Sequence, residues 1–239
     1  GLLAAAAHNV KRQRPRIRLF ETGLRFFPDA DYRQQSALGL LICGSRSPES
    51  WTSSSDVVDF YDMKGELEAL LAGAKGNLEF RSTVRPGLHD GQTAELLLNG
   101  AVVGVMGRIH PATASQLDLP RHVYVAELEL DAITPRRVPE FQEISRYPET
   151  RRDLAVVVDR GVPATEVLAV ARSAAGPSVS EALIFDVYQG EGIAKTEKSL
   201  AIGLTFRDQS RTLTDEEISE SLAQVIVSLQ EKLSAKLRH

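Results

Sequence analysis

The feature that most limits how this chain can fold is a proline-rich break, AITPRRVPEFQEISRYP, at residues 132–148. Three of its residues are prolines, which lack an amide donor and disfavour helix in the residue before them. Few of its apolar positions are periodic. No single helix or strand is expected to cross this segment, so we place a domain boundary near Ile144, with residues 141–145 as a linker between residues 1–140 and 146–239.

Length and composition describe a globular chain of one or two domains. The 239 residues are 43% hydrophobic and 25% charged, with a mean hydropathy of -0.15, which excludes disordered and fibrous proteins. No stretch approaches the ~20 apolar residues of a membrane span. A single cysteine, Cys43, excludes an intrachain disulfide and a zinc site with several cysteines, and it fits a reducing compartment.

The charge of the chain is nearly balanced, with 28 basic and 32 acidic residues and a formal net charge of -4. Neither half is basic, because residues 1–145 hold 16 basic and 18 acidic groups and residues 146–239 hold 12 and 14. Any contact with nucleic acid must therefore come from a local patch.

Residues 1–140 show the pattern of a mixed, mostly antiparallel sheet with helices. Helices are expected at residues 2–13 and 56–72, and strands at 16–26, 37–43, 95–99, 101–108 and 123–130. The Asn99-Gly100 pair predicts a tight hairpin between two of the strands.

Residues 146–239 show the order of a ferredoxin-like βαββαβ domain, so the whole chain is of the α+β class. Strands are expected at residues 152–159, 179–189 and 199–207 and briefly near Leu237, and helices at 163–175 and 214–237. Thr214 and Glu217 form a capping box at the start of the last helix. This plan covers one face of the sheet with two helices and leaves the other face open.

No catalytic or metal-binding motif stands out. The chain has no G-x-S-x-G, H-E-x-x-H or G-x-x-x-x-G-K sequence, and its five histidines are far apart. The acidic series Asp56, Asp59, Asp62 and Glu66 lies at a helix start, where carboxylates favour the helix dipole, so we prefer a structural role to a metal site.

The open face of the ferredoxin-like sheet is the most informative surface, because alternate residues of a strand point to opposite faces. We assign to the core Leu154, Val156, Val158, Leu183, Phe185, Val187, Leu200, Ile202, Leu204 and Phe206. The residues left for the open face are Asp153, Ala155, Val157, Asp186, Tyr188, Ser199, Ala201, Gly203, Thr205 and Arg207. Small residues beside one aromatic favour a surface for single-stranded RNA, and a plain solvated sheet is the alternative.

Five segments resemble the C-terminal part of the bacterial phenylalanyl-tRNA synthetase beta subunit. They are RLFETG (18–23), VDFYDMKGELEALL (58–71), VVGVMGRIHP (102–111), RYPETRRDLAVVV (146–158) and LIFDVYQGEGIAKTEKSLAIGLTFRDQSRTLTDEEI (183–218). The resemblance implies that residues 1–140 are a class II synthetase-like core domain truncated at its N-terminus. It implies that residues 146–239 are a ferredoxin-fold anticodon-binding domain.

The resemblance also implies a function in which this chain is not the catalyst. In the family, an α2β2 heterotetramer in the cytoplasm charges tRNA(Phe) with phenylalanine, using ATP and magnesium, and catalysis lies in the alpha subunit. Here the segment Arg18–Glu21 is at most a remnant of one class II motif, and Gly104–Arg108 lacks the glutamate of another. The first domain is therefore expected to be catalytically silent, to hold no cofactor and to contact the alpha subunit.

For the second domain, the resemblance places the tRNA contact on the open sheet face. Tyr188 matches the tyrosine that would stack on an anticodon base, and Ala155 and Ser199 match small positions beside it. Supporting contacts are expected from basic groups to phosphate and from an acid to a base edge: Arg152, Lys198, Arg207 and Asp186. The alternative is a stand-alone RNA-binding or regulatory ferredoxin-like protein.

Overall fold

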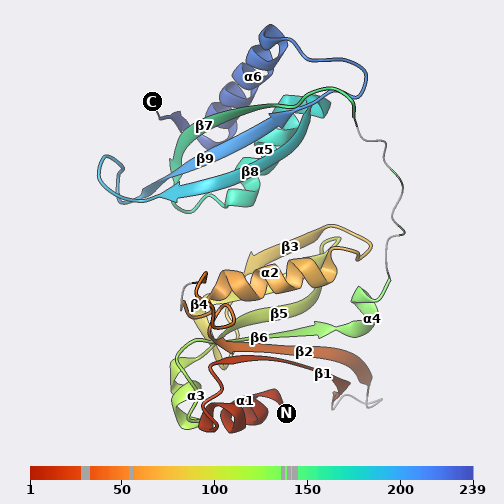
Figure 1. The fold of residues 1–239 in the computed structure, drawn as a ribbon, viewed down its shortest axis with the longest axis vertical. Helices are drawn as coiled ribbons and strands as arrows, with labels where there is room; N and C mark the ends of the chain where they lie inside the picture. The colour runs from red at the N-terminus through yellow and green to blue at the C-terminus, as the bar shows by residue number, and fades with distance from the viewer. Residues whose placement is uncertain (28–32, 54–55, 136–137, 139–140, 142–144, 239) are drawn as a thin grey trace. The chain divides into compact units, whose positions relative to one another are not determined.

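The chain forms two compact units in the computed structural model, Gly1–Glu140 and Phe141–His239, which we call the N-terminal and the C-terminal unit (Figure 1). The structure describes residues 1–27, 33–53, 56–135, 138, 141 and 145–238. The predicted boundary at Ile144 and most of the predicted linker lie outside the described residues. No helix in the described part of the chain is long and apolar enough to cross a membrane.

The N-terminal unit contains a six-stranded sheet in the order β1-β2-β6-β5-β4-β3, in which all neighbours are antiparallel. Its strands are β1 (Arg16–Phe26), β2 (Gln34–Gly44), β3 (Leu78–Ser82), β4 (Leu88–Leu98), β5 (Ala101–Ile109) and β6 (Val123–Glu129). Its helices are α1 (Leu2–Lys11), α2 (Phe60–Leu71), α3 (Pro111–Gln116) and α4 (Leu130–Ile133). The hairpin at Asn99-Gly100 is confirmed, and both residues have positive φ.

Helix α2 begins at Phe60 because Asp59 caps it. The Asp59 carboxylate accepts hydrogen bonds from the amides of Tyr61 and Asp62, and Asp62 accepts one in return from the amide of Asp59. This capping box satisfies amides that a helix start leaves unpaired. The same two carboxylates pair with Arg46, so these members of the acidic series have structural partners within the chain.

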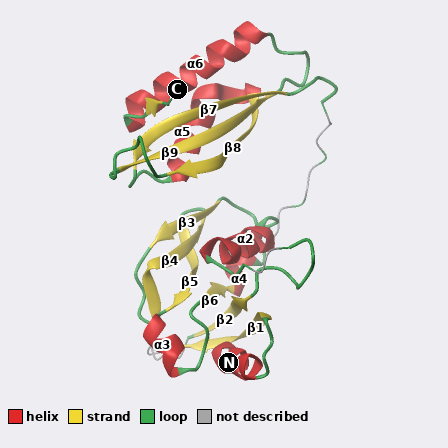
Figure 2. Cartoon of the chain, turned by 60° about the vertical axis from the view of Figure 1, so that its left-hand side comes forward, coloured by secondary structure: helices red, strands yellow, loops and turns green. Residues whose placement is uncertain are grey.

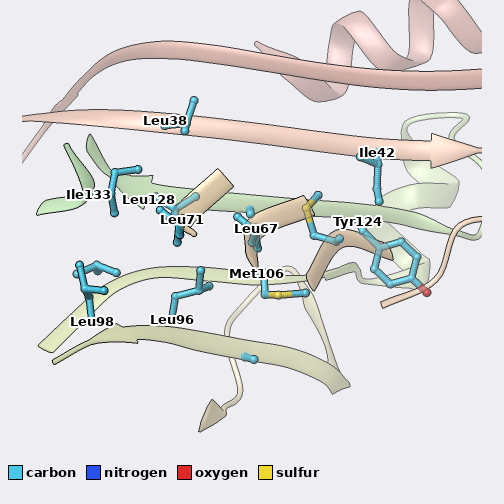
Figure 3. Packing of buried hydrophobic residues seen from close by; sticks show 14 of the residues in the cluster. Leu38, Ile42, Leu67, Leu71, Leu96, Leu98, Met106, Tyr124, Leu128 and Ile133 are labelled. Atoms are coloured by element: carbon cyan, nitrogen blue, oxygen red, sulfur yellow. The ribbon is translucent and has the colours of Figure 1, made fainter. Parts of the chain in front are cut away.

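Two apolar layers hold the N-terminal sheet. On one face, α2 packs its buried side chains against β2, β4, β5 and β6, and Figure 3 shows Leu67 and Leu71 among Leu96, Met106 and Leu128. A second cluster joins α1 and α3 to the sheet and includes Cys43. Burial raises the pKa of the Cys43 thiol to about 11, so it is protonated and unreactive at neutral pH.

The C-terminal unit contains a four-stranded antiparallel sheet in the order β10-β7-β9-β8. Its strands are β7 (Thr150–Asp159), β8 (Val179–Tyr188), β9 (Glu197–Phe206) and β10 (Lys236–Leu237). Its helices are α5 (Ala164–Ala175), α6 (Asp215–Leu233) and the short 3₁₀ helix Gly176–Ser178. The order βαββαβ confirms the ferredoxin-like prediction, and α5 and α6 lie together on one face of the sheet (Figure 2).

The covered face of this sheet confirms the predicted alternation along β7 and β9. Leu200, Ile202, Leu204 and Phe206 are each at most 1% exposed and pack with residues of α5 and α6. Because every second residue of β9 is buried in this layer, the residues between them face the other side.

Helix α6 has the predicted capping box. The Thr214 hydroxyl accepts a hydrogen bond from the amide of Glu217, and the Glu217 carboxylate accepts one from the amide of Thr214. Hydrogen bonds from the Arg211 guanidinium, with the one from the Thr214 amide, lower the pKa of Glu217 from 4.5 to about 2. The cap is therefore complete throughout the neutral pH range.

Candidate nucleic-acid interface

The floor of the candidate site is a row of small residues on the two central strands of the C-terminal unit. In the register of β7 and β9, Ala155 lies opposite Ala201 and Asp153 lies opposite Gly203. Directly opposed residues of an antiparallel pair share a face, so these positions all lie on the face away from α5 and α6. The short side chains of Ala155 and Ala201 let a planar group approach the sheet closely at that pair.

Tyr188 ends β8 beside this floor, in register with Ser199. Its hydroxyl donates a hydrogen bond to the carbonyl oxygen of Glu191 at 3.2 Å. The following loop packs tightly on the ring, because a Cβ at Gly190 would lie only 2.5 Å from the hydroxyl. Tyr188 remains 37% exposed, whereas Ser199 is only 4% exposed.

Arg238 reaches the same ring from the opposite edge of the sheet. Its amide donates to the carbonyl oxygen of Ala155, which places it just after β10, next to β7. Its guanidinium carbon lies 4.8 Å from the centroid of the Tyr188 ring. We did not find Arg238 from the sequence, because only the strand order brings the end of the chain across the sheet to Tyr188.

The assignment of Leu183 and Phe185 to the core was wrong. The register of β8 against β9 shifts between Ile184, opposite Ile202, and Asp186, opposite Ala201, so Phe185 is an extra residue in a bulge. Phe185 is 51% exposed, and Leu183 is in register with Gly203 on the open face. Simple alternation fails here because one inserted residue reverses the side on which the preceding residues lie.

Val187 is also not in the core, although it is in register with Leu200, because it is 54% exposed. It lies near the end of an edge strand, where the cluster packed under α5 and α6 does not include it. Ala182 and Ile184 join that cluster instead.

The structure brings four of the predicted site residues together on the open face: Tyr188, Ala155, Ser199 and Asp186. Two others lie on the helix-covered side. Arg152 is in register with Leu204 and forms a 2.8 Å ion pair with Asp215 of α6. The Lys198 amine donates to the carbonyl oxygens of Arg160 and Val162, at 3.1 and 2.6 Å. Arg207 lies just beyond β9 and pairs with Glu149.

The motif-like residues of the N-terminal unit have structural partners. Arg18 forms an ion pair with Glu66 of α2 at 2.8 Å and donates to the carbonyl oxygen of Arg46. Gly104 permits close packing of strands, because a Cβ there would lie 2.6 Å from the carbonyl oxygen of Glu127. Among the described residues there is no group of three or more His, Cys, Asp or Glu side chains placed to bind a metal ion.

Two family models match successive parts of the chain. Residues 1–130 match the family model described as phenylalanyl tRNA synthetase beta chain CLM domain. Residues 145–238 match the model of the ferredoxin-fold anticodon binding domain.

Relatives match the chain over its whole length. It is 47% identical to the phenylalanine--tRNA ligase beta subunit of Pseudomonas syringae pv. tomato and 46% identical to that of Dickeya dadantii. The match covers all of this chain but about 30% of the first relative and 31% of the second. These findings confirm the resemblance seen in the sequence: the chain belongs to the phenylalanyl-tRNA synthetase beta-chain family.

Proposed function

We propose that the C-terminal unit binds the anticodon of tRNA(Phe), with the open face of its sheet as the contact surface. The observation that supports this most is the arrangement of Tyr188 beside a floor of small residues on the sheet face away from α5 and α6. The match of residues 145–238 to an anticodon-binding family model and the names of the relatives point to the same ligand.

In this proposal an anticodon base stacks on the Tyr188 ring and lies against Ala155 and Ala201. Aromatic side chains on an open sheet are a common platform for unpaired bases. The Arg238 guanidinium contacts the same Tyr188 ring and is placed to contact the nucleotide as well. Asp186, in register with Ala201, is placed to accept a hydrogen bond from a base edge.

Phosphate contacts are assigned to basic groups at the margins of the face. Arg207, just beyond β9, keeps this assignment as a prediction, and a phosphate would have to displace Glu149 from its ion pair with Arg207. We assign Arg152 and Lys198 to holding the unit together, because both are engaged on the helix-covered side. Replacing Arg152 or Lys198 is expected to lower the stability of the C-terminal unit more than it weakens RNA binding.

For the whole protein we propose a beta subunit of an α2β2 phenylalanine--tRNA ligase, acting in the cytoplasm. Residues 1–140 form a catalytically silent domain that contacts the alpha subunit, residues 146–239 form the anticodon-binding domain, and 141–145 link them. The alpha subunit carries the reaction with ATP and magnesium. A stand-alone RNA-binding protein is not favoured, because the relatives match the N-terminal unit as well.

The contact surface is tested by mapping amide chemical shifts of the 239-residue chain during titration with the tRNA(Phe) anticodon stem-loop. We expect the changes to concentrate on the open face, at Ala155, Ala201 and Tyr188, because bound bases alter the surroundings of those strands. A duplex with the same stem and no loop is the control. Changes confined to α5 and α6 or to the N-terminal unit contradict the proposal.

A further inference from the structure

A second aromatic side chain, Phe185, lies on the open face, although strict alternation assigned it to the core. The bulge in β8 places Phe185 half exposed on this face, and the Arg151 guanidinium carbon lies 5.1 Å from the centroid of its ring. Arg151 comes from the start of β7, in register with Thr205, so two strands separated by β9 meet here.

The position of the Arg151 guanidinium is set by two neighbours. Its Nε donates a 2.8 Å hydrogen bond to the Asp153 carboxylate. It also rests on the backbone of β9, because a Cβ at Gly203 would lie 2.7 Å from Nη2 and 2.9 Å from Cζ. Among the described residues, none accepts a hydrogen bond from its terminal nitrogens. These nitrogens are therefore available to a ligand.

The Phe185–Arg151 pair is separate from the Tyr188 ring. Tyr188 is in register with Ser199, and the Arg151 guanidinium lies over Gly203, four residues along β9. At ~3.4 Å per residue, the Arg151 guanidinium is about 14 Å from the Tyr188 position along β9. Phe185 is three residues before Tyr188 on β8, so the two rings are separated by about 10 Å along the strand. One stacked base does not span this distance, so the face has room for two nucleotides.

The charge around the Phe185–Arg151 pair favours a base over a phosphate as its ligand. Asp153 neutralises Arg151 through their ion pair, so no net positive charge is available to attract phosphate. A planar guanidinium beside an aromatic ring offers a stacking surface together with a fork of donors. The matching acceptors are those on the Hoogsteen edge of a purine, where N7 is one.

We infer that Phe185, Arg151 and Gly203 form a second nucleotide subsite, which takes a purine of the same RNA strand that contacts Tyr188. The purine stacks on Phe185, and Arg151 donates to its edge. Asp153 and Gly203 are positioning residues that hold the guanidinium in place. This inference rests on the proposed anticodon role of the face.

The test is a titration of the 239-residue chain with the anticodon stem-loop and with versions lacking one base at each loop position. For the wild-type chain we expect two loop positions at which base removal weakens binding about 5- to 150-fold, the usual range for one stacked base. In Phe185→Ala and Gly203→Ala, one of these positions is expected to lose its effect while the other keeps it.

Gly203→Ala is the sharpest variant, because it removes no functional group and the three atoms nearest to the added Cβ all belong to the far end of the Arg151 side chain. Arg151→Lys keeps the charge and loses the planar fork, so we expect it, like Arg151→Ala, to remove the effect of one of the two loop positions. Lys232→Ala, which removes an exposed charge at the end of α6, is the matched control and is expected to bind as the wild type does. The salt dependence of binding is expected to be unchanged in Phe185→Ala.

Two outcomes overturn the inference separately from the proposed function. If Phe185→Ala and Gly203→Ala keep both sensitive positions while Tyr188→Ala loses one, the second subsite is refuted and the anticodon role stands. If Arg151→Lys binds as the wild type does, Arg151 contacts phosphate and the purine-edge assignment is wrong. If the wild-type chain has no sensitive loop position, the proposed function itself fails.

Discussion

Replacing Phe206 with alanine is expected to lower the free energy of unfolding of the C-terminal unit by about 3–5 kcal/mol, the usual cost of emptying a buried phenylalanine site. Phe206 is 1% exposed and lies in β9 between Thr150 and Val179, in the layer packed under α5 and α6. The loss is measured by urea denaturation, with hydrogen exchange of the β9 amides reporting on this unit.

Phe185→Ala is the matched control, because it makes the same chemical change in the same sheet. Since Phe185 is half exposed on an edge strand, we expect Phe185→Ala to lower the free energy of unfolding by only about 1 kcal/mol. Equal losses in the two variants would mean that Phe185 is buried, and would refute the bulge and the subsite built on it.

Replacing Tyr188 with alanine is expected to weaken binding of the anticodon stem-loop about 5- to 150-fold, which corresponds to the ~1–3 kcal/mol of one base–aromatic stack. The fold is expected to remain intact, because Tyr188 is 37% exposed and lies outside the core cluster. Affinity is measured by titration, and folding by circular dichroism of the same samples.

Tyr188→Phe separates stacking from the hydroxyl group. This variant keeps the ring and loses only the hydrogen bond to the carbonyl oxygen of Glu191. If the base stacks on the ring, Tyr188→Phe binds nearly as well as the wild type. A folded Tyr188→Ala variant with wild-type affinity would remove Tyr188 from the site.

Most elements of the fold follow from local patterns. The limits of β1 and the capping box of α6 were predicted as they are observed, because alternation and the Thr214–Glu217 pair are local signals. Strand β3 and helices α3 and α4 were missed, since each has at most six residues and depends on its neighbours. Helix α6 ends at Leu233, four residues before the predicted end, where Ser234 adopts a left-handed conformation.

The candidate site was only partly predictable. Alternation placed Tyr188, Ala155 and Ser199 on one face, because β7 and β9 are regular. It failed for Phe185, because a bulge depends on pairing with the next strand. It also had no means of finding Arg238, which reaches Tyr188 through the strand order β10-β7-β9-β8.

Anticodon recognition is tested most directly by titrating the 239-residue chain with the native tRNA(Phe) anticodon stem-loop and with one whose anticodon is scrambled, at low and moderate salt. Base recognition on the sheet face predicts tighter binding of the native loop, with the preference retained as salt rises, because stacking and base-edge contacts do not depend on counterion release. Equal binding of both loops that weakens steeply with salt would show phosphate attraction alone and contradict the account.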